Sequence, residues 1–448
     1  MSLKSWFCTI FDYNDGMTEL DHKMRIAMIS YHTCPLATLG GKDSGGMNVY
    51  VKELTRKLGE MGIYVDVFTR SQDEHVPHVL HDLGYGNRVV HIPAGPEHPL
   101  SKKELAQHIP EFVQHILEFA GKKTCRYDLI HSHYWMSGIA AEALKEAWDV
   151  PVIQMFHTLG RMKNRIARSP EEREGDYRIN GEQEVLDTAD ALVIATPAEK
   201  TQLEYLYKAD RIPTFIIPPG VDTARFYPIP PDEAREYVGI QPDDHMILFV
   251  GRIEPLKGID TLLQAIRKLQ NKGVIKCCNQ YVAIIGGNTD DEASDPNSEM
   301  ARLQKMCIEI GIGDLVLFLG KRDQDALPYY YSAADVVVMP SHYESFGMVA
   351  LEAMACGTPV VASQVGGLAF LVKDEQTGYV IPSDDPDILA DRLDALLENP
   401  DLREKLGKQA AAYALGYDWS IIAGQVADLY RQVIDQQIQR QKVHGDLH

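Results

Sequence analysis

The sequence lacks the marks of several large classes of protein. No run in it reaches the roughly 18 apolar residues that a membrane helix needs. Residues 1–23 carry only a short apolar patch, from Trp6 to Phe11, which acidic residues follow, so they do not fit a secretory signal. The seven cysteines are odd in number, scattered and without metal-site spacing, so we expect reduced thiols in a cytoplasmic protein.

Basic residues are scarce as well. The chain has 44 lysines and arginines against 64 aspartates and glutamates, which gives a net charge of −20. This charge disfavours a nucleic-acid partner and an anionic membrane surface, because both bind basic patches. It is still compatible with a local basic pocket for a phosphate. The length of 448 residues exceeds that of one ordinary core, so we expect two domains.

A polar turn between a strand and a helix is the most informative stretch. The strand-like run 334–340 leads into a turn that holds Glu344, and the apolar segment Met348–Cys356 is typical of a buried helix. Glu352 lies on that helix, just over two turns after Glu344. The helix N-terminus suits a phosphate, and the two carboxylates suit the hydroxyl groups of a ribose and of a sugar. The pattern indicates a nucleotide-sugar site. The alternative is a pair of solvated glutamates, which the apolar neighbours of Glu352 make less fitting.

A glycine-rich loop stands between the first strand and the first long helix. Residues 25–30 form the strand, residues 40–48 the loop and Val49–Met61 the amphipathic helix. Glycines such as Gly45 and Gly46 let a backbone approach a diphosphate closely. The spacing is not that of the GxGxxG motif, so a nicotinamide dinucleotide is disfavoured. A flexible loop before a helix is the alternative.

Two cations follow the strand that opens the second half of the chain. Arg252 and Lys257 come after the strand 246–250, where fixed positive charge would stabilise a leaving diphosphate without a metal. A charged surface loop is the alternative. The D-x-D string at 323–325 suggests a metal site at first sight, but it precedes a helix predicted at 326–334. We therefore interpret it as an N-cap.

Polar side chains gather at the ends of two predicted neighbouring strands. The segments 128–135 and 151–158 are strands that run into histidines, at the sheet edge where ligands bind. One such histidine is usually structural, but histidines on two neighbouring strands favour a functional role. Two cations, a phenol and a hydroxyl are expected at the mouth of the same cleft, and this set suits the phosphate of an acceptor. Its members are Lys102, Tyr134, Thr158 and Arg178.

These motifs together resemble those of family-4 glycosyltransferases, the retaining enzymes of the GT-B architecture. The likeness lies in the spacing of Glu344 and Glu352, in the Gly-Arg…Lys-Gly segment at 251–258, and in the loop with Gly45 and Gly46. It covers nearly the whole chain.

The resemblance implies an architecture and assigns roles to the candidate residues. The fold would be α/β, with two Rossmann-like domains facing across a cleft. Residues 1–222 would bind the acceptor, completed by a helix at about 419–448, and residues 223–418 would bind the donor. The catalytic residues would be His157, Arg252, Lys257 and Glu344. The donor-binding residues would be Gly45, Gly46, Arg252, Lys257, Glu344, Ser345, Phe346, Gly347 and Glu352. The acceptor-binding residues would be Asn48, Lys102, Tyr134, Thr158 and Arg178.

The reaction that the resemblance implies is transfer of glucose from UDP-glucose to a phosphorylated sugar, with retention of configuration. Fructose 6-phosphate is the first acceptor expected, as in sucrose-phosphate synthases. The alternative is transfer of N-acetylglucosamine from its UDP derivative to an inositol phosphate. No metal or other cofactor is expected, and no oligomeric state is predicted. Two further hypotheses are a sugar-binding protein without catalysis, which would not need Arg252 with Lys257, and a nucleotide-sugar epimerase.

Overall fold

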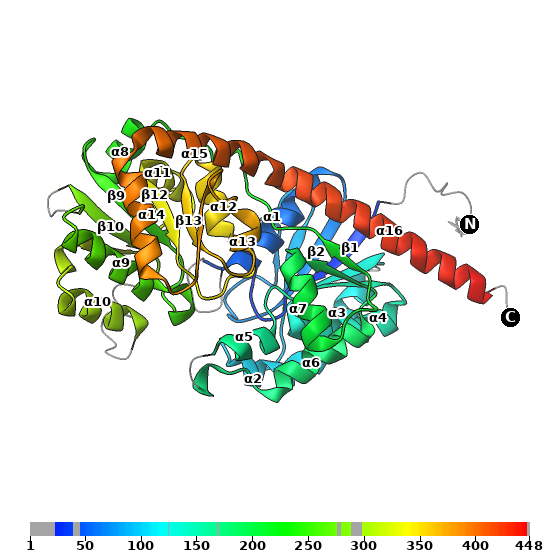
Figure 1. Cartoon of the computed structure of the whole chain (residues 1–448). Helices are drawn as coiled ribbons and strands as arrows, with labels where there is room; N and C mark the ends of the chain where they lie inside the picture. The colour runs from blue at the N-terminus through cyan, green and yellow to red at the C-terminus, as the bar shows by residue number, and fades with distance from the viewer. Residues whose placement is uncertain are drawn as a thin grey trace, which may run out of the picture.

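The structure contains two α/β domains, each built on a sheet of parallel strands (Figure 1). It is a computed structural model and describes residues 23–38, 45–123, 125–167, 170–275, 279–287 and 298–445. Most strands are buried on both faces, which explains their near-continuous apolar sequences. The prediction of two Rossmann-like domains facing across a cleft is confirmed.

Eight strands form the first sheet. They are β1 (Arg25–Ile29), β2 (Tyr64–Arg70), β3 (Val79–Leu80), β4 (Arg88–Ile92), β5 (Leu129–His133), β6 (Val152–Met155), β7 (Ala191–Ile194) and β8 (Thr214–Ile216). Their spatial order is β3-β4-β2-β1-β5-β6-β7-β8, and β3 alone among them pairs antiparallel. From β4 to β7 this is the strand order of doubly wound nucleotide-binding sheets.

Six parallel strands form the second sheet. They are β9 (His245–Val250), β10 (Gln280–Ile285), β11 (Val316–Gly320), β12 (Val336–Met339), β13 (Val360–Ser363) and β14 (Gly378–Ile381). Their order, β11-β10-β9-β12-β13-β14, is the same doubly wound order. In both domains the chain therefore changes its winding direction beside the first strand, between β1 and β5 and between β9 and β12.

Helices pack on both faces of each sheet. Those of the first domain are α1 (Gly46–Glu60), α2 (Lys102–Leu105), α3 (Ile109–Lys123), α4 (Trp135–Trp148), α5 (Gly160–Ile166), α6 (Asp176–Thr188) and α7 (Pro197–Tyr207). Those of the second domain are α8 (Pro231–Val238), α9 (Ile259–Asn271), α10 (Glu299–Glu309), α11 (Leu327–Ala333), α12 (Met348–Ala355), α13 (Leu368–Leu371), α14 (Pro386–Glu398) and α15 (Pro400–Ala414). The sequence explains α9, because its buried Leu262, Ile266 and Leu269 recur at helical spacing.

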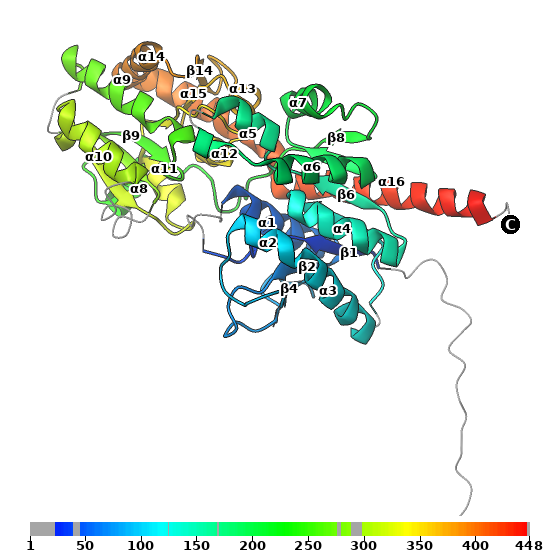
Figure 2. The ribbon, with the colours of Figure 1, turned by 90° about the horizontal axis from the view of Figure 1, so that it is seen from below.

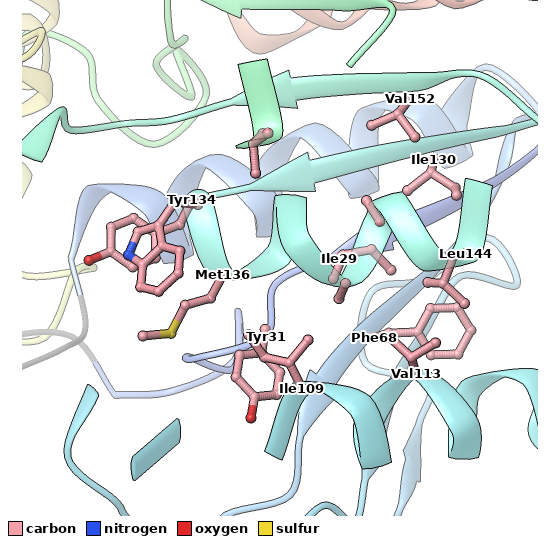
Figure 3. Close-up of a cluster of buried hydrophobic side chains, with 14 of the residues drawn as sticks. Ile29, Tyr31, Phe68, Ile109, Val113, Ile130, Tyr134, Met136, Leu144 and Val152 are labelled. Atoms are coloured by element: carbon pink, nitrogen blue, oxygen red, sulfur yellow. The ribbon is translucent and has the colours of Figure 1, made fainter. Parts of the chain in front are cut away.

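Alternate residues of β1 enter two different hydrophobic cores. Ala27 and Ile29 pack in the core that includes side chains of α3 and α4. Figure 3 shows part of this cluster, with Tyr134 at one end and its hydroxyl oxygen pointing away from the apolar side chains. Ile26 and Met28 enter the core on the opposite face. This alternation follows from the two-residue period of a strand.

The last helix, α16 (Trp419–Gly445), packs on the first domain although it follows the second in sequence. Trp419, Val426 and Tyr430 are buried in the same core as Ile26 and Met28. Figures 1 and 2 show α16, in red, running along the first domain. Residues at the two ends of the chain thus share one core.

Several elements differ from the prediction. Helix α1 begins at Gly46 rather than Val49, because the Asn48 side chain accepts a hydrogen bond from the Gly45 N–H at 2.9 Å and closes the first turn. The short strands β3 and β14 are absent from the sequence-based prediction. The N-cap interpretation of residues 323–325 is wrong. Ala326 occupies the N-cap of α11 without a side-chain bond, and Asp325 instead pairs with Arg225 at 3.2 Å.

Candidate active site

The ligand site of this fold is expected beyond the strand ends, where the winding direction of each sheet changes. A cavity of about 280 Å³ lies between the domains at this edge. The segment after β1 and the helix α1 form one wall, and the turn after β11 forms the other. Its charged lining residues are Lys52 from the first domain and Lys321, Arg322 and Asp323 from the second, three cations against one carboxylate. The cavity therefore has a local positive charge in a protein whose net charge is negative.

Two helices from different domains, α1 and α12, begin at the domain junction. A Cβ atom added to Gly46, the first residue of α1, would lie 3.2 Å from Sδ of Met348, the first residue of α12. Figures 1 and 2 both place these helices side by side. Gly347 precedes α12 with a φ of +103°, which side-chain-bearing residues rarely adopt. Because helix N-termini carry unpaired N–H groups and partial positive charge, this junction favours an anionic group such as a diphosphate.

Lys257 and Glu344 form an ion pair on the donor side of the cleft. Lys257 ends the short 3-10 helix Pro255–Lys257 after β9, and its Nζ lies 2.5 Å from Glu344 Oε2. Their side chains are 17% and 15% exposed. Arg252, the other predicted cation, pairs with Glu254 at 2.8 Å. Lys257 thus already has Glu344 as its anionic partner. A bound diphosphate would have to share Lys257 with that carboxylate.

Backbone packing shapes the turn that carries Glu344. A Cβ added to Gly366 would lie 2.0 Å from the carbonyl oxygen of Glu344, and one added to Gly367 would lie 2.1 Å from Phe346 Cα. Both positions therefore require glycine. The Phe346 side chain is buried in the core of the second domain. Only the backbone of Phe346 is therefore available for the predicted contact with a donor. Ser345 is half-buried and lines a small cavity between the domains.

Glu352 is a buried carboxylate on α12. It is 8% exposed, and its Oε2 accepts a hydrogen bond from the Tyr331 hydroxyl at 2.9 Å. Burial raises the pKa of Glu352 to about 7, which the hydrogen bond from Tyr331 only partly opposes. Hydroxyl groups of a ribose would favour the ionised form by donating further hydrogen bonds to it. The structure does not place a solvated glutamate here.

His157 lies just beyond β6 and is held by a second histidine. Its backbone has a φ of +60°, and its Nε2 lies 3.1 Å from Nδ1 of His133, the last residue of β5. His131 bonds in turn to the Tyr430 hydroxyl of α16, at 2.7 Å. Burial lowers the pKa of both His131 and His157 to about 3. The imidazole of His157 is therefore neutral at physiological pH and able to bind a sugar hydroxyl.

The four residues predicted for an acceptor phosphate come together. Arg178 Nη2 donates to both the carbonyl and the hydroxyl oxygen of Thr158, each at 3.0 Å. The Arg178 guanidinium lies 5.0 Å from the centre of the Tyr134 ring, and Lys102 Nζ lies 5.9 Å from it. The Tyr134 hydroxyl is buried and has no hydrogen-bond partner within the described ranges. Since a buried donor without a partner is costly, this atom favours a ligand at the site.

Arg178 is also neutralised, which the sequence analysis missed. Its Nε donates to Glu182 at 2.8 Å and its Nη1 to Glu174 at 2.6 Å. The Arg178 side chain is only 1% exposed. The i−4 and i+4 spacing of the two glutamates around Arg178 is the sequence signal for these pairs.

Asn48 supports the loop rather than reaching into the cleft. It is 1% exposed, and its amide nitrogen donates to the Thr33 hydroxyl and the Cys34 carbonyl, both at 2.7 Å. Its amide oxygen accepts from the Gly45 N–H. Gly45 itself is in an extended conformation at the N-cap of α1. The amide atoms of Asn48 thus hold the β1–α1 connection, and its direct contact with an acceptor stays a prediction.

Metal-binding clusters and membrane-crossing helices are both absent from the described ranges. These ranges hold no cluster of three or more histidine, cysteine or acidic side chains that could bind a metal ion. Nor does any helix within them have the length and apolar character to cross a membrane.

Comparison with known proteins identifies the family. Residues 231–413 match the model of glycosyl transferases group 1, and residues 44–225 match that of glycosyltransferase family 4. D-inositol 3-phosphate glycosyltransferase 2 from Catenulispora acidiphila is 41% identical over 412 residues, which cover 92% of this chain and 95% of the relative. The chain belongs to glycosyltransferase family 4.

Two other similar proteins extend this result to the whole fold. The D-inositol 3-phosphate glycosyltransferase of Frankia alni is 39% identical over 90% of this chain and 98% of its own. Among solved structures, sucrose-phosphate synthase from Thermosynechococcus elongatus superposes with a TM-score of 0.83 and 34% identity, covering 92% and 100% of the two chains. This family-4 glycosyltransferase is thus an enzyme that takes a sugar from a nucleotide-sugar donor, with the GT-B fold that the sequence predicts.

Proposed function

We propose that this glycosyltransferase transfers N-acetylglucosamine from UDP-N-acetylglucosamine to a hydroxyl of an inositol phosphate, with retention of configuration. The relatives that carry the name D-inositol 3-phosphate glycosyltransferase, at 41% and 39% identity, support this acceptor. The observation that carries a phosphorylated acceptor is the buried Tyr134 hydroxyl, which has no hydrogen-bond partner among the described residues and lies beside two cations, Lys102 and Arg178. The proposal reverses the order of the two acceptors given by sequence analysis, where fructose 6-phosphate stood first.

In this proposal the donor binds to the second domain. Its diphosphate lies at the junction of α1 and α12, where Gly46 leaves room and the two helix N-termini supply positive potential. Glu352 accepts hydrogen bonds from the ribose. Glu344 and His157 hold the sugar from opposite sides of the cleft. Both domains thus contribute to one donor site.

The reaction proceeds on one face of the sugar. The bond between the anomeric carbon and the diphosphate oxygen breaks, and the acceptor oxygen bonds to the carbon from the same side. The acceptor's proton passes to the departing diphosphate oxygen. Negative charge grows on the diphosphate as it leaves, and Lys257 and Arg252 stabilise it electrostatically. Fixed cations do this without a metal ion in the proposal, so activity is expected to persist in EDTA.

Sucrose-phosphate synthesis is the second candidate. The specific observation in its favour is the likeness to the sucrose-phosphate synthase of Thermosynechococcus elongatus, at a TM-score of 0.83 and 34% identity. Its acceptor, fructose 6-phosphate, would use the same cations. The two candidates therefore share the phosphate site and differ in the rest of the acceptor and in the donor sugar.

A matrix of donors and acceptors tests the proposal. UDP release is measured with UDP-N-acetylglucosamine or UDP-glucose, each with D-inositol 3-phosphate, fructose 6-phosphate or no acceptor, in EDTA. The proposal predicts release with UDP-N-acetylglucosamine and D-inositol 3-phosphate, and a product that retains the anomeric configuration. Release with UDP-glucose and fructose 6-phosphate alone would establish the second candidate. Formation of a new nucleotide sugar without any acceptor would indicate an epimerase.

A further inference from the structure

Glu174 binds two of the cations that border the proposed phosphate site. Its Oε1 accepts hydrogen bonds from Lys163 Nζ at 2.8 Å and from Arg178 Nη1 at 2.6 Å. Burial raises the pKa of Glu174, but the positive charges of Arg178, Lys163 and Lys102 outweigh it and hold the pKa below its usual value. The side chain is 15% exposed. An ionised carboxylate thus lies among three cations at the edge of the cleft.

The guanidinium of Arg178 has one side that a ligand can take over. Its Nε is bound by Glu182, and its Nη2 by the two oxygen atoms of Thr158. Glu182 is fully buried and also accepts a hydrogen bond from the Gly160 N–H at 2.9 Å, so it is a fixed part of the fold. The remaining nitrogen, Nη1, points to Glu174. Glu174 is therefore the exchangeable partner of the two.

The Glu174 carboxylate does not satisfy every hydrogen-bond donor of the site. The Tyr134 hydroxyl, on the ring that stacks against Arg178, stays without a hydrogen-bond partner in the described structure. A carboxylate has two oxygen atoms, whereas a phosphate monoester offers three terminal ones. A phosphate is thus able to accept hydrogen bonds from Arg178, Lys163 and Tyr134 together, which Glu174 does not achieve.

We propose that Glu174 is a built-in competitor for the acceptor's phosphate, which occupies Arg178 and Lys163 until a phosphate monoester displaces it. This inference rests on the proposed phosphorylated acceptor. The backbone of Glu174 is fixed by Asn164, whose side chain bonds to its N–H at 2.6 Å and its carbonyl at 3.0 Å. The exchange therefore needs only a rotation of the glutamate side chain.

The competition sets specificity. A neutral hydroxyl or a weakly binding anion gains little from cations that already have a carboxylate partner. A doubly charged phosphate gains more, because it replaces one negative charge by two and also satisfies Tyr134. Glu174 lowers the affinity of the site for every anion, and it does so most for anions that cannot displace its carboxylate. The site thus discriminates between ligands through a competing interaction.

Binding of inorganic phosphate to the full chain tests this role without any acceptor. Phosphate dissociation constants are obtained from phosphate-induced rises in melting temperature. Glu174→Gln keeps the side chain's shape and removes its charge, so we expect phosphate to bind about ten-fold more tightly. Glu184→Gln is the matched control, because Glu184 is an exposed residue on α6, the helix that begins two residues after Glu174, and its replacement changes the net charge equally. The control is expected to bind phosphate as the unmodified protein does.

A second variant and a kinetic measurement complete the test. Glu174→Asp shortens the side chain, so we expect a smaller gain in phosphate affinity, and this variant decides the matter if Glu174→Gln does not fold. Unchanged or weaker phosphate binding in the folded variants would overturn the inference. In turnover, the KM for D-inositol 3-phosphate should fall in Glu174→Gln while the KM for the donor stays constant. If no phosphorylated acceptor supports turnover, the proposed function fails, and the phosphate titration still decides the role of Glu174.

Discussion

Replacing Tyr134 by phenylalanine should raise the stability of the protein and at the same time lower its catalytic efficiency with the acceptor. The Tyr134 side chain is 5% exposed, and its hydroxyl is buried without a hydrogen-bond partner in the described structure. A buried, unsatisfied polar group costs about 1–3 kcal/mol, and Tyr134→Phe removes only that group. We therefore expect the free energy of unfolding to rise by about 1 kcal/mol, which corresponds to an increase in melting temperature of about 2–4 °C for a domain of this size.

The same change should weaken binding of the acceptor. If the hydroxyl donates to the acceptor's phosphate, its loss removes one charge-assisted hydrogen bond, worth about 1.5–3 kcal/mol. This predicts a fall in kcat/KM for the phosphorylated acceptor of about 10- to 100-fold, with UDP affinity unchanged. Steady-state kinetics at varied acceptor and calorimetric binding of UDP measure the two effects.

Tyr127 offers a matched control for this experiment. It is also 5% exposed, but its hydroxyl donates to Asp66 at 2.7 Å. Tyr127→Phe should therefore lower the melting temperature and leave acceptor kinetics unchanged, the reverse of Tyr134→Phe. If Tyr134→Phe instead destabilised the protein and left acceptor kinetics intact, the hydroxyl would have a structural partner and the assignment of the phosphate site would be refuted.

Two further predictions concern the donor side. Glu352 has a pKa of about 7 in the folded protein against 4.5 for an ordinary glutamate, so the folded state binds more protons between these pH values and stability falls as pH rises through this window. In the unmodified protein this lowers the free energy of unfolding by about 3 kcal/mol across the window, and Glu352→Gln should abolish that decrease. Thermal unfolding from pH 4.5 to 8 measures it, and the same pH dependence of stability in the variant would contradict the burial argument. Lys257→Gln should lower kcat by about 100-fold or more with little change in acceptor KM, since it removes a fixed charge aimed at the leaving diphosphate. Unchanged kcat in single-turnover measurements would exclude that role.

Sequence analysis predicts the parts of the site that follow from strand order. Tyr134 and Thr158 come directly after β5 and just beyond β6, and parallel neighbouring strands must bring such residues to one edge. The helix with Glu352 is likewise predicted by its continuously apolar sequence, and the turn with Glu344 by the strand and the helix on either side of it. The need for glycine at Gly366 and Gly367 comes from the structure instead, where a Cβ atom at either position would collide with the backbone of the turn.

The sequence alone does not show which partners a polar side chain binds in the folded protein. Arg178 is a cation at the right place, but only the structure shows that Glu174 and Glu182 already bind it. Arg178→Ala would therefore leave Glu182 as a buried, unpaired charge and destabilise the fold by about 3–5 kcal/mol, so its effect on the acceptor would not be separable. Asn48 is a similar case, because the donors and acceptors of its amide are taken by loop atoms that are distant in sequence.

The central claim is that the first domain binds an acceptor through its phosphate. The most direct measurement compares kcat/KM for D-inositol 3-phosphate with that for unphosphorylated inositol, at saturating UDP-N-acetylglucosamine. Loss of charge-assisted contacts to Lys102, Tyr134 and Arg178 predicts a preference of at least about 100-fold for the phosphorylated acceptor. Equal efficiency with the two acceptors would contradict the account, since the cluster around Arg178 would then serve the fold alone.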